Sequence, residues 1–288
     1  MELNDIIEQS KHPIADIQFQ KKCHSILKNN GVLTLPDFLT DNALKTLLKE
    51  AQDGMKDAYY CQNKHTVYLQ SISTDDDTTE KSNHPRHRHV ISSKGCICDD
   101  QIASNSILRQ LYNSTIFRNF IIAVTATVTV TANNNNNTST EEQNFLYPYK
   151  DKLSSINIHY AQRGQELGWH FDNSDFAITL LIQKPKRGGQ FEYVKDIRRS
   201  NWKEDEEKEK DDDKTIQQIT QLLDGVIKPK LLDMYPGTLV LFRGRNSIHR
   251  VSPNESDTVR ILAVLAYNSK PNIALSENAR MTFYGRLY

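Results

Sequence analysis

The stretch from residue 153 to residue 272 is a series of short β-like runs separated by turn residues, and it restricts the possible folds more than any other feature. The runs are rich in β-branched and aromatic residues and are bounded by Gly, Pro, Asn or Asp. They are Ile156–Tyr160, Phe176–Gln183, Gly189–Tyr193, Thr238–Phe242 and Val259–Tyr267. No helical period separates them, whereas parallel strands need a crossover that is usually a helix. We therefore expect a mostly β protein with an antiparallel barrel or jelly roll at about residues 145–272.

The first 125 residues carry mainly helical patterns. Residues 1–60 look helical at both ends, with a short strand at Gly31–Pro36 between them, and Thr40 is placed to cap a helix whose leucines recur at helical spacing. A second helical zone covers residues 100–124, and the segment Val124–Val130 fits either a strand or the end of that helix. The pattern predicts helices at about residues 1–125 that flank the β core, within one domain spanning residues 1–288.

Polar residues are concentrated in three segments, at about residues 71–83, 132–143 and 200–215. The second contains a tract of five asparagines, and the third contains the run Lys203–Lys214, with eight acids and four lysines. Such segments cannot bury apolar surface, so we interpret them as insertions outside the core. They account for much of the low apolar share of 38%, against about 45–50% in ordinary globular chains.

Charge and cysteine content exclude several classes of protein. Lys plus Arg and Asp plus Glu are both 36, so the chain has no net charge that would attract nucleic acid or an anionic membrane. No apolar run approaches the roughly 20 residues that span a bilayer, and the first residues do not resemble a signal peptide. Four cysteines are too few for a disulfide scaffold. We expect a cytoplasmic enzyme with a small-molecule substrate, and the oligomeric state stays open.

Three residues have the types and spacing of a metal site. His170 and Asp172 are two apart, and on a strand residues i and i+2 project from the same face. His249 follows 77 residues later, just after the expected strand Thr238–Phe242. Two histidines and one carboxylate form the facial triad of non-haem Fe(II) oxygenases, which leaves positions on the metal for a 2-oxo acid and O2. The spacing therefore predicts an Fe(II) site.

Other residues support the same chemistry. Arg260 comes eleven residues after His249 at the start of a strand, where it could pair with the distal carboxylate of 2-oxoglutarate. Gly188 and Gly189 suggest a hairpin turn. Gly244 is expected to take a positive φ in a turn that sets the angle of His249.

Three segments of the sequence, Trp169–Val194, Pro236–Pro253 and Arg260–Pro271, resemble the Fe(II)/2-oxoglutarate-dependent oxygenase superfamily. More narrowly, the chain is similar to the branch that contains free-amino-acid (lysine-type) halogenases, their hydroxylase relatives and algal kainoid synthases. This resemblance implies a double-stranded β-helix, a cupin-like jelly roll. It also implies Fe(II) as cofactor, with 2-oxoglutarate and O2 as cosubstrates and a role in secondary metabolism.

One position separates activities within that branch. The halogenases that resemble this chain have Gly where this chain has Asp172, and that Gly opens a coordination position for halide. A carboxylate ligand leaves no such vacancy, so halogenation is disfavoured. The resemblance instead implies oxidation of a C–H bond, which ends either in an alcohol or, where an alkene is within reach, in ring closure as in kainoid biosynthesis.

Substrate and cosubstrate contacts are predicted at further positions. A substrate with carboxylates needs cations in the pocket, and by resemblance a polar contact follows the carboxylate ligand. The candidates for the substrate are Arg86, Arg88, Arg163 and Asn173. For the arginines the alternative is a solvent-facing basic loop. Asn157 and His159, which alternate on an expected strand, could face 2-oxoglutarate or simply line the barrel.

Several functions stay open on the sequence. One is hydroxylation of a free amino acid. Another is oxidative cyclisation of an N-prenylated glutamate, for which Phe283 and Tyr284 would suit the prenyl chain. A third is a protein hydroxylase of the prolyl type, with the acidic run as a docking loop. A non-enzymatic jelly-roll binding module is the alternative outside enzymes.

Overall fold

The computed structural model describes residues 3–70, 84–126, 145–174, 176–198 and 211–288. Within them, eleven strands form one hydrogen-bonded antiparallel sheet. The strands are β1 (Val32–Leu35), β2 (Tyr59–His65), β3 (Val90–Ile97), β4 (Ile156–Ala161), β5 (Leu167–His170), β6 (Ala177–Gln183), β7 (Phe191–Val194), β8 (Lys230–Leu232), β9 (Leu239–Phe242), β10 (Ile248–Val251) and β11 (Arg260–Leu265). The expected mostly β fold with a jelly-roll core is confirmed.

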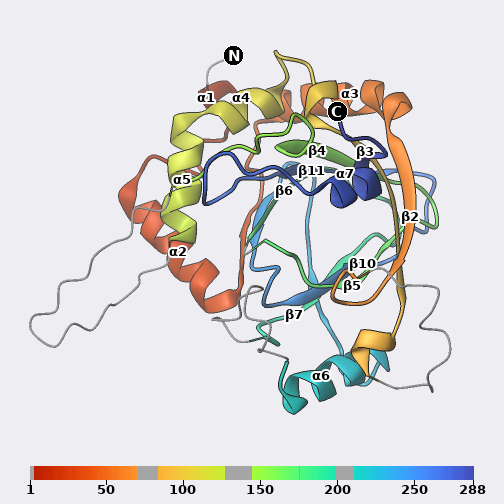
Figure 1. Cartoon of the computed structure of the whole chain (residues 1–288). Helices are drawn as coiled ribbons and strands as arrows, with labels where there is room; N and C mark the ends of the chain where they lie inside the picture. The colour runs from red at the N-terminus through yellow and green to blue at the C-terminus, as the bar shows by residue number, and fades with distance from the viewer. Residues whose placement is uncertain (1–2, 71–83, 127–144, 175, 199–210) are drawn as a thin grey trace, which may run out of the picture.

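The sheet folds over on itself at β3. One end of β3 pairs with β4, from Gly95 to Ile97, while Ser92 pairs with Leu167 of β5. The strands in the order β1–β9–β6–β11–β4 therefore form one layer, and β5–β10–β7–β8 form the other (Figure 1). β2 continues the sheet from the other edge of β3. A cavity lies between the two layers, and both contribute side chains to it.

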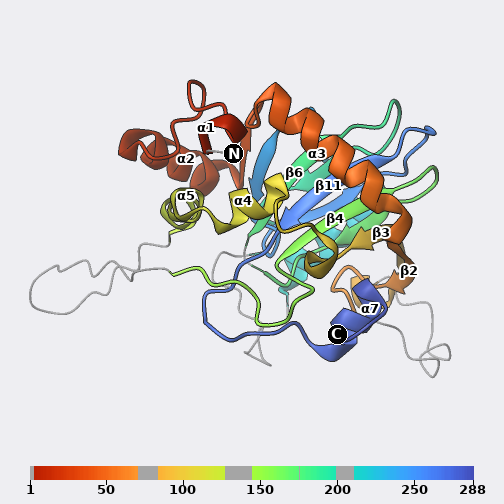
Figure 2. The same ribbon diagram turned by 90° about the horizontal axis from the view of Figure 1, so that it is seen from above.

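Among the described residues, five α-helices precede the core and two more occur later in the chain. Their bounds are α1 (Leu3–Ile6), α2 (Ile17–Asn30), α3 (Asp41–Gly54), α4 (Ile107–Asn113), α5 (Thr115–Thr125), α6 (Asp213–Leu223) and α7 (Glu277–Tyr284). The helices α2 and α5 lie side by side, and α3 runs across the top of the larger layer (Figures 1 and 2). The Thr40 side chain accepts a hydrogen bond from the Ala43 backbone N–H, as expected of a helix cap.

Alternation along the strands separates the core from the cavity. In β11, Ile261, Ala263 and Leu265 belong to the large apolar core shared with the N-terminal helices. Arg260, Leu262 and Val264, at the positions between them, line the cavity instead. Because successive strand side chains point to opposite faces, one face of this layer binds the helices and the other builds the site.

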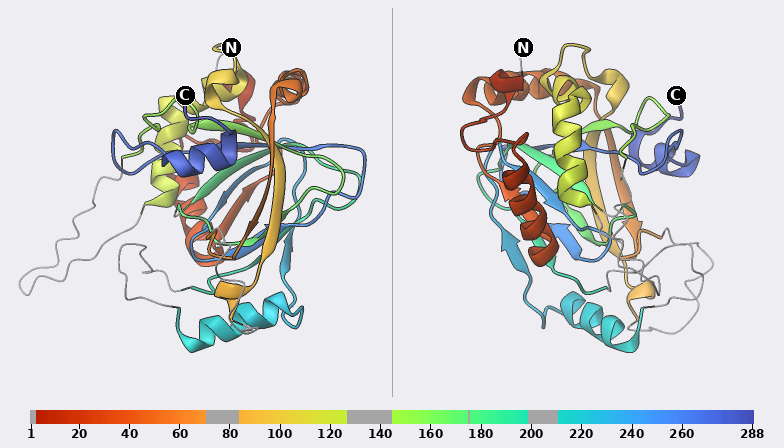
Figure 3. Two further views of the ribbon diagram at one scale, coloured as in Figure 1. Left: turned by 45° about the vertical axis from the view of Figure 1, so that its right-hand side comes forward. Right: turned by 90° about the vertical axis from the view of Figure 1, so that its left-hand side faces the viewer.

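The two later helices correct the expectation that the second half contains no helix. The helix α6 packs outside the smaller layer through Ile219 and Leu222, which join a cluster with Trp169 and Phe171. It begins within the third expected insertion, where the Asp212 carboxylate caps it by accepting from the Thr215 N–H. The helix α7 lies against β2 and β3 (Figure 3). The helix α6 was not predicted because its capping residue, Asp212, lies within the acidic run. In sequence, an aspartate of a charged segment cannot be distinguished from an aspartate that caps a helix.

The remaining expectations have mixed outcomes. The short strand near Gly31–Pro36 is β1, and α5 ends at Thr125, so the ambiguous segment begins as a helix end. Residues 127–130, the first two insertions and residues 200–210 of the third lie outside the described residues. The N-terminal part is less helical than expected, because it also contributes β2 and β3 to the sheet. Within the described part of the chain, no helix has both the length and the apolar character that crossing a bilayer requires.

Candidate active site

His170, Asp172 and His249 converge at one place between the two layers. β10 pairs with β5 so that His249 lies directly opposite His170. The Oδ1 atom of Asp172 is 3.6 Å from Nε2 of His170 and 3.5 Å from Nε2 of His249. One donor atom from each of the three residues lies within 4.8 Å of the others. The three predicted residues therefore meet at a distance that a single metal ion can bridge.

The backbone brings these residues together differently from the expectation. His170 is the last residue of β5, and Asp172 lies in the loop beyond it. The Asp172 N–H donates to the Gly244 carbonyl oxygen, at 3.1 Å, which fixes the loop beside the chain leading to β10. His249 is a residue of β10 itself and does not follow β9 directly. Strand alternation thus does not align the carboxylate; a hydrogen bond to a distant loop does.

The hydrogen bonds of the triad leave its metal-binding atoms free to coordinate. Nδ1 of His170 donates to the Gly168 carbonyl oxygen at 2.7 Å, and Nδ1 of His249 donates to that of Ser247 at 3.0 Å. A carbonyl can only accept, so the lone pair of each ring is on Nε2, which faces Asp172. The second carboxylate oxygen, Oδ2 of Asp172, is buried and has no hydrogen-bond partner. Two imidazole lone pairs and an unsatisfied carboxylate fit a divalent metal such as Fe(II).

Electrostatics favour the charge states that bind metal. Burial, with His249 nearby, lowers the pKa of His170 to about 3, so its ring is neutral near pH 7. Burial by itself raises the pKa of Asp172, but the adjacent His249 and His170 more than offset this and the net shift is downward. A neutral imidazole and an ionised carboxylate are the forms that coordinate a metal.

The Asp172 side chain approaches the backbone at position 244 so closely that only glycine fits there. A Cβ built on it would lie 1.7 Å from Oδ2 of Asp172, far inside any allowed contact. The expected positive φ is not found, since Gly244 is outside the set of glycines in the left-handed region. The glycine is needed here so that the carboxylate can lie directly against the backbone.

The cavity beside the triad has a volume of about 330 Å³ and a largely apolar wall. Its apolar side chains come from both layers and from α7, and they include Phe191, Phe242, Leu262, Val264 and Phe283. Phe283 lines the cavity as expected, whereas the Tyr284 hydroxyl donates to the Asn157 side chain. A space of this size and character suits a small molecule with an apolar part.

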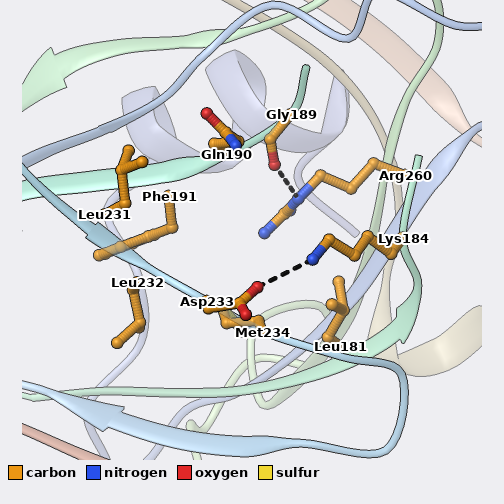
Figure 4. A pocket seen from close by; sticks show the side chains of 10 residues that line it. All are labelled: Leu181, Lys184, Gly189, Gln190, Phe191, Leu231, Leu232, Asp233, Met234 and Arg260. Atoms are coloured by element: carbon orange, nitrogen blue, oxygen red, sulfur yellow. Dashed lines mark hydrogen bonds and ion pairs between the residues drawn. The ribbon is translucent and has the colours of Figure 1, made fainter. Parts of the chain in front are cut away.

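Arg260 is buried in the wall of the same cavity. Its Nε donates to the Gly189 carbonyl oxygen at 3.1 Å, and burial lowers its pKa to about 10. No ion pair joins Arg260 to a carboxylate of the described residues. Figure 4 shows the guanidinium beside Lys184, which pairs with Asp233 at 3.0 Å, in a smaller adjoining pocket of about 140 Å³. Arg260 is thus a buried cation available to an anion.

The two glycines before β7 have a role other than the predicted hairpin. Gly188 and Gly189 do adopt positive φ values of 68° and 60°. However, β6 pairs with β9 and β11, while β7 pairs with β10 and β8, so these strands do not form a hairpin. The turn instead presents the Gly189 carbonyl to Arg260.

The two residues of β4 that were predicted to contact 2-oxoglutarate, Asn157 and His159, have different surroundings. His159 lines the cavity, and its Nε2 is 3.0 Å from Nζ of Lys94. Asn157 is buried but satisfied by protein, because its amide donates to two backbone carbonyls and its oxygen accepts from Tyr284. The geometry accordingly uses Asn157 to hold α7 against the barrel.

The predicted substrate residues lie away from the cavity wall. Arg86 stacks on the Tyr68 ring, and Arg88 pairs with Asp224 at the end of α6. Arg163 pairs with Asp257 through two exposed side chains. Asn173 is exposed, and its backbone carbonyl accepts a hydrogen bond from Arg245. Their roles as substrate ligands stay predictions, since the cavity in this structure is lined by other residues.

Two residues that the sequence reasoning missed lie at the site. Lys94 projects from β3 into the cavity, and Arg198 supports the segment between the metal ligands. Strand geometry places Ser92, Lys94 and Cys96 on one face of Val90–Ile97, but the residue pattern of this segment does not show that the face meets a cavity. No local pattern marks Arg198, whose partners are far away in sequence.

Arg198 joins three segments behind the metal site. Its guanidinium lies 3.7 Å from the ring centroid of Phe171, the residue between His170 and Asp172, and 5.0 Å from that of Tyr68. Its Nε and a terminal nitrogen donate to both oxygens of Asp211, at 3.1 and 3.4 Å. Both side chains are only 4% exposed. This buried pair holds Phe171 in place and so restrains the two ligands that flank it.

Replacing Arg198 with methionine is expected to lower the free energy of unfolding by about 3–5 kcal/mol, because the Asp211 carboxylate would stay buried without its cationic partner. Urea denaturation measures the loss. The double variant R198M/D211N removes both charges and should recover much of it. A loss below about 1 kcal/mol, typical of a surface pair, would contradict this assignment.

Comparison with known proteins adds a family and a fold. A family model described as Halogenase D (HalD) matches residues 16–282. No curated protein matches the chain in sequence. Among solved structures, a prolyl hydroxylase from Trichoplax adhaerens, in complex with a hypoxia inducible factor peptide, has a TM-score of 0.51 at 12% identity, covering 88% of this chain and 90% of that one. The α-ketoglutarate-dependent carbocyclase SnoK of nogalamycin biosynthesis has a TM-score of 0.50 at 10% identity, covering 86% and 83%. At such identities the similarity shows a shared fold.

Proposed function

This chain belongs to the Halogenase D family, and from that premise we propose that it is an Fe(II)/2-oxoglutarate-dependent oxygenase that oxidises a C–H bond of a small amino acid or amino-acid derivative. The observation that carries the proposal is the triad of His170, Asp172 and His249, with its buried unsatisfied Oδ2, in one cavity with the unpaired cation Arg260.

Each residue of the site has a distinct role in this proposal. His170, Asp172 and His249 would hold Fe(II) on one side and leave positions for 2-oxoglutarate and O2. Bound iron would couple the decarboxylation of 2-oxoglutarate to the oxidation of a C–H bond. Arg260 would bind the distal carboxylate of the cosubstrate, with the Gly189 carbonyl orienting its guanidinium. The apolar wall would exclude water from the reacting centre.

Oxygenation is a better fit than halogenation, despite the family name. Asp172 supplies a carboxylate within 3.6 Å of both histidine Nε2 atoms, so it would occupy the position that a halide needs. Gly244 makes room for that carboxylate and so supports its role as a ligand. We propose hydroxylation or oxidative cyclisation as the outcome.

Two substrate classes remain within this proposal. One is a free amino acid, which would be hydroxylated. The other is an N-prenylated glutamate, which would be cyclised as in kainoid biosynthesis. The apolar cavity wall, which includes Phe283, favours the second class, because a prenyl chain needs apolar surroundings and a free polar amino acid does not.

The test is turnover of the iron-loaded protein with 2-oxoglutarate and O2. Succinate is measured in the presence of free amino acids, N-prenylated glutamates or proline-containing peptides, and products are identified by mass spectrometry. Cyclisation removes two hydrogens from the substrate and hydroxylation adds one oxygen. We expect succinate to form at a rate that rises with N-prenylated glutamates. Turnover stimulated by peptides alone would favour a protein hydroxylase, and the absence of iron-dependent succinate would refute the oxygenase.

A further inference from the structure

Besides Arg260 and the exposed Lys64, the cavity wall contains a further cation, Lys94. Lys94 projects from the middle of β3, and its Nζ lies 3.0 Å from Nε2 of His159 and 5.2 Å from the ring centroid of Phe283 in α7. The imidazole nitrogen accepts from the ammonium group, and the aromatic ring offers its face to the charge. Both contacts orient the ammonium group inside the cavity without neutralising it.

Lys94 forms no ion pair with any carboxylate of the described residues. The acid that influences it is Asp172, which is engaged in the triad. Burial lowers the pKa of Lys94, as expected where a cation has lost water without gaining an anion. The thiols of Cys96 and Cys61 also act on Lys94, and the pKa of Cys96 is lowered chiefly by a hydrogen bond with Cys98. A cation without an anionic partner in the wall of a largely apolar cavity costs stability, so the position of Lys94 points to a ligand that carries negative charge.

Lys94 and Arg260 lie in different parts of the cavity. Arg260 also borders the smaller pocket beside β8, together with Lys184 and Asp233 (Figure 4). Lys94 does not line that pocket and lies instead by α7. His159 lies between them, because it contacts Lys94 and pairs in register with Leu262, two residues from Arg260. A single carboxylate of 2-oxoglutarate therefore does not pair with both Arg260 and Lys94.

We propose that Lys94 is a substrate-binding residue that pairs with a carboxylate of the substrate, while Phe283 and neighbouring apolar side chains contact the substrate's apolar part. This inference rests on the proposed function and narrows it, because it requires the substrate to be an anion with an apolar body. A substrate that presents only an ammonium group to this end of the cavity would be repelled by Lys94.

The experiment uses the full chain loaded with Fe(II) and saturated with 2-oxoglutarate under argon. Calorimetric titration compares hexanoate with hexanamide, which have the same apolar body and differ in charge. We expect the wild type to bind hexanoate at least 10-fold more tightly. Lys94→Met should reduce this preference to less than 2-fold, and Lys94→Arg should retain it. Lys94→Gln replaces the methionine variant if the latter does not fold by circular dichroism.

Control variants separate this inference from its alternatives. Lys49→Met removes an exposed lysine of α3 and should leave the hexanoate preference and the affinity for 2-oxoglutarate unchanged. The affinity for 2-oxoglutarate should fall at least 10-fold in Arg260→Met and stay within 2-fold in Lys94→Met.

Equal losses of 2-oxoglutarate affinity in both variants would overturn the inference, as would a hexanoate preference that is absent from the wild type or unchanged in Lys94→Met. Tighter hexanoate binding by Cys96→Ser, by 10-fold or more, would also overturn it, because the thiolate would then be the partner of Lys94. If the wild type fails to bind 2-oxoglutarate with Fe(II), the proposed function itself fails.

Discussion

Replacing His170 with alanine is expected to abolish stoichiometric iron binding and to reduce succinate formation by more than about 100-fold, the upper end of what changes around a metal ligand cost. The physical reason is that the remaining donors, Asp172 and His249, would hold the metal from two directions only. Iron content by elemental analysis and succinate by mass spectrometry measure the two effects. Both should fall together, because in this site the metal and the chemistry depend on the same ligands.

His24→Ala is the matched control for that variant. His24 is half-buried, and its Nδ1 bonds to the Val124 carbonyl between α2 and the end of α5, outside the cavity. Its loss should affect stability while iron content and succinate formation per folded molecule stay the same. Undiminished turnover in His170→Ala would show that the metal assignment is wrong.

Gly244→Ala is expected to weaken iron binding by about 10–100-fold, although the substitution adds one methyl group to a residue that is not itself a ligand. The new Cβ would fall 1.7 Å from Oδ2 and 2.5 Å from Cγ of Asp172. The carboxylate would have to move, and the hydrogen bond between the Asp172 N–H and the Gly244 carbonyl would be distorted with it. Titration of the protein with Fe(II) under argon measures the affinity.

Gly164→Ala provides the comparison for this prediction. Gly164 has a positive φ of 83° and open space where a Cβ would lie, so alanine there costs backbone strain of about 1–2 kcal/mol without any contact. That variant should be less stable and should bind iron normally. If Gly244→Ala bound iron as tightly as the wild type, the close packing of Asp172 on this backbone would have no functional role.

Local patterns predicted the architecture well because they record burial. The five expected strands correspond to β4, β6, β7, β9 and β11, and the N-terminal helices lie where the apolar stripes place them. A strand was expected at His170 and Asp172, and β5 forms there but ends at His170, whereas the short strands β8 and β10 were missed. Strands of three or four residues carry too few alternating positions to stand out, and these gain their hydrogen bonds from neighbours that lie far away in sequence.

In the site, too, some residues were predictable from the sequence and others were not. The sequence predicted the triad residues, which meet in the structure, because donor type and spacing are visible without a structure. It also predicted Arg260, which lines the same cavity, while its role toward 2-oxoglutarate stays a prediction. It also predicted substrate binding by Arg86, Arg88 and Arg163, which form cation–π and ion-pair contacts outside the cavity wall, and that role stays a prediction. It missed Lys94, because a lysine within a strand does not reveal whether its face meets solvent or a cavity.

The sequence by itself determined the chemical groups available and the alternation that buries one face of each strand. The tertiary structure decided which groups meet. Asp172 reaches the histidines because its loop is bonded to Gly244, and Arg198 supports Phe171 because Asp211 is buried beside it. Lys94 faces the cavity because the sheet folds over at β3 and α7 lies against it. These contacts join residues distant in sequence, so their energies depend on packing that no local pattern records.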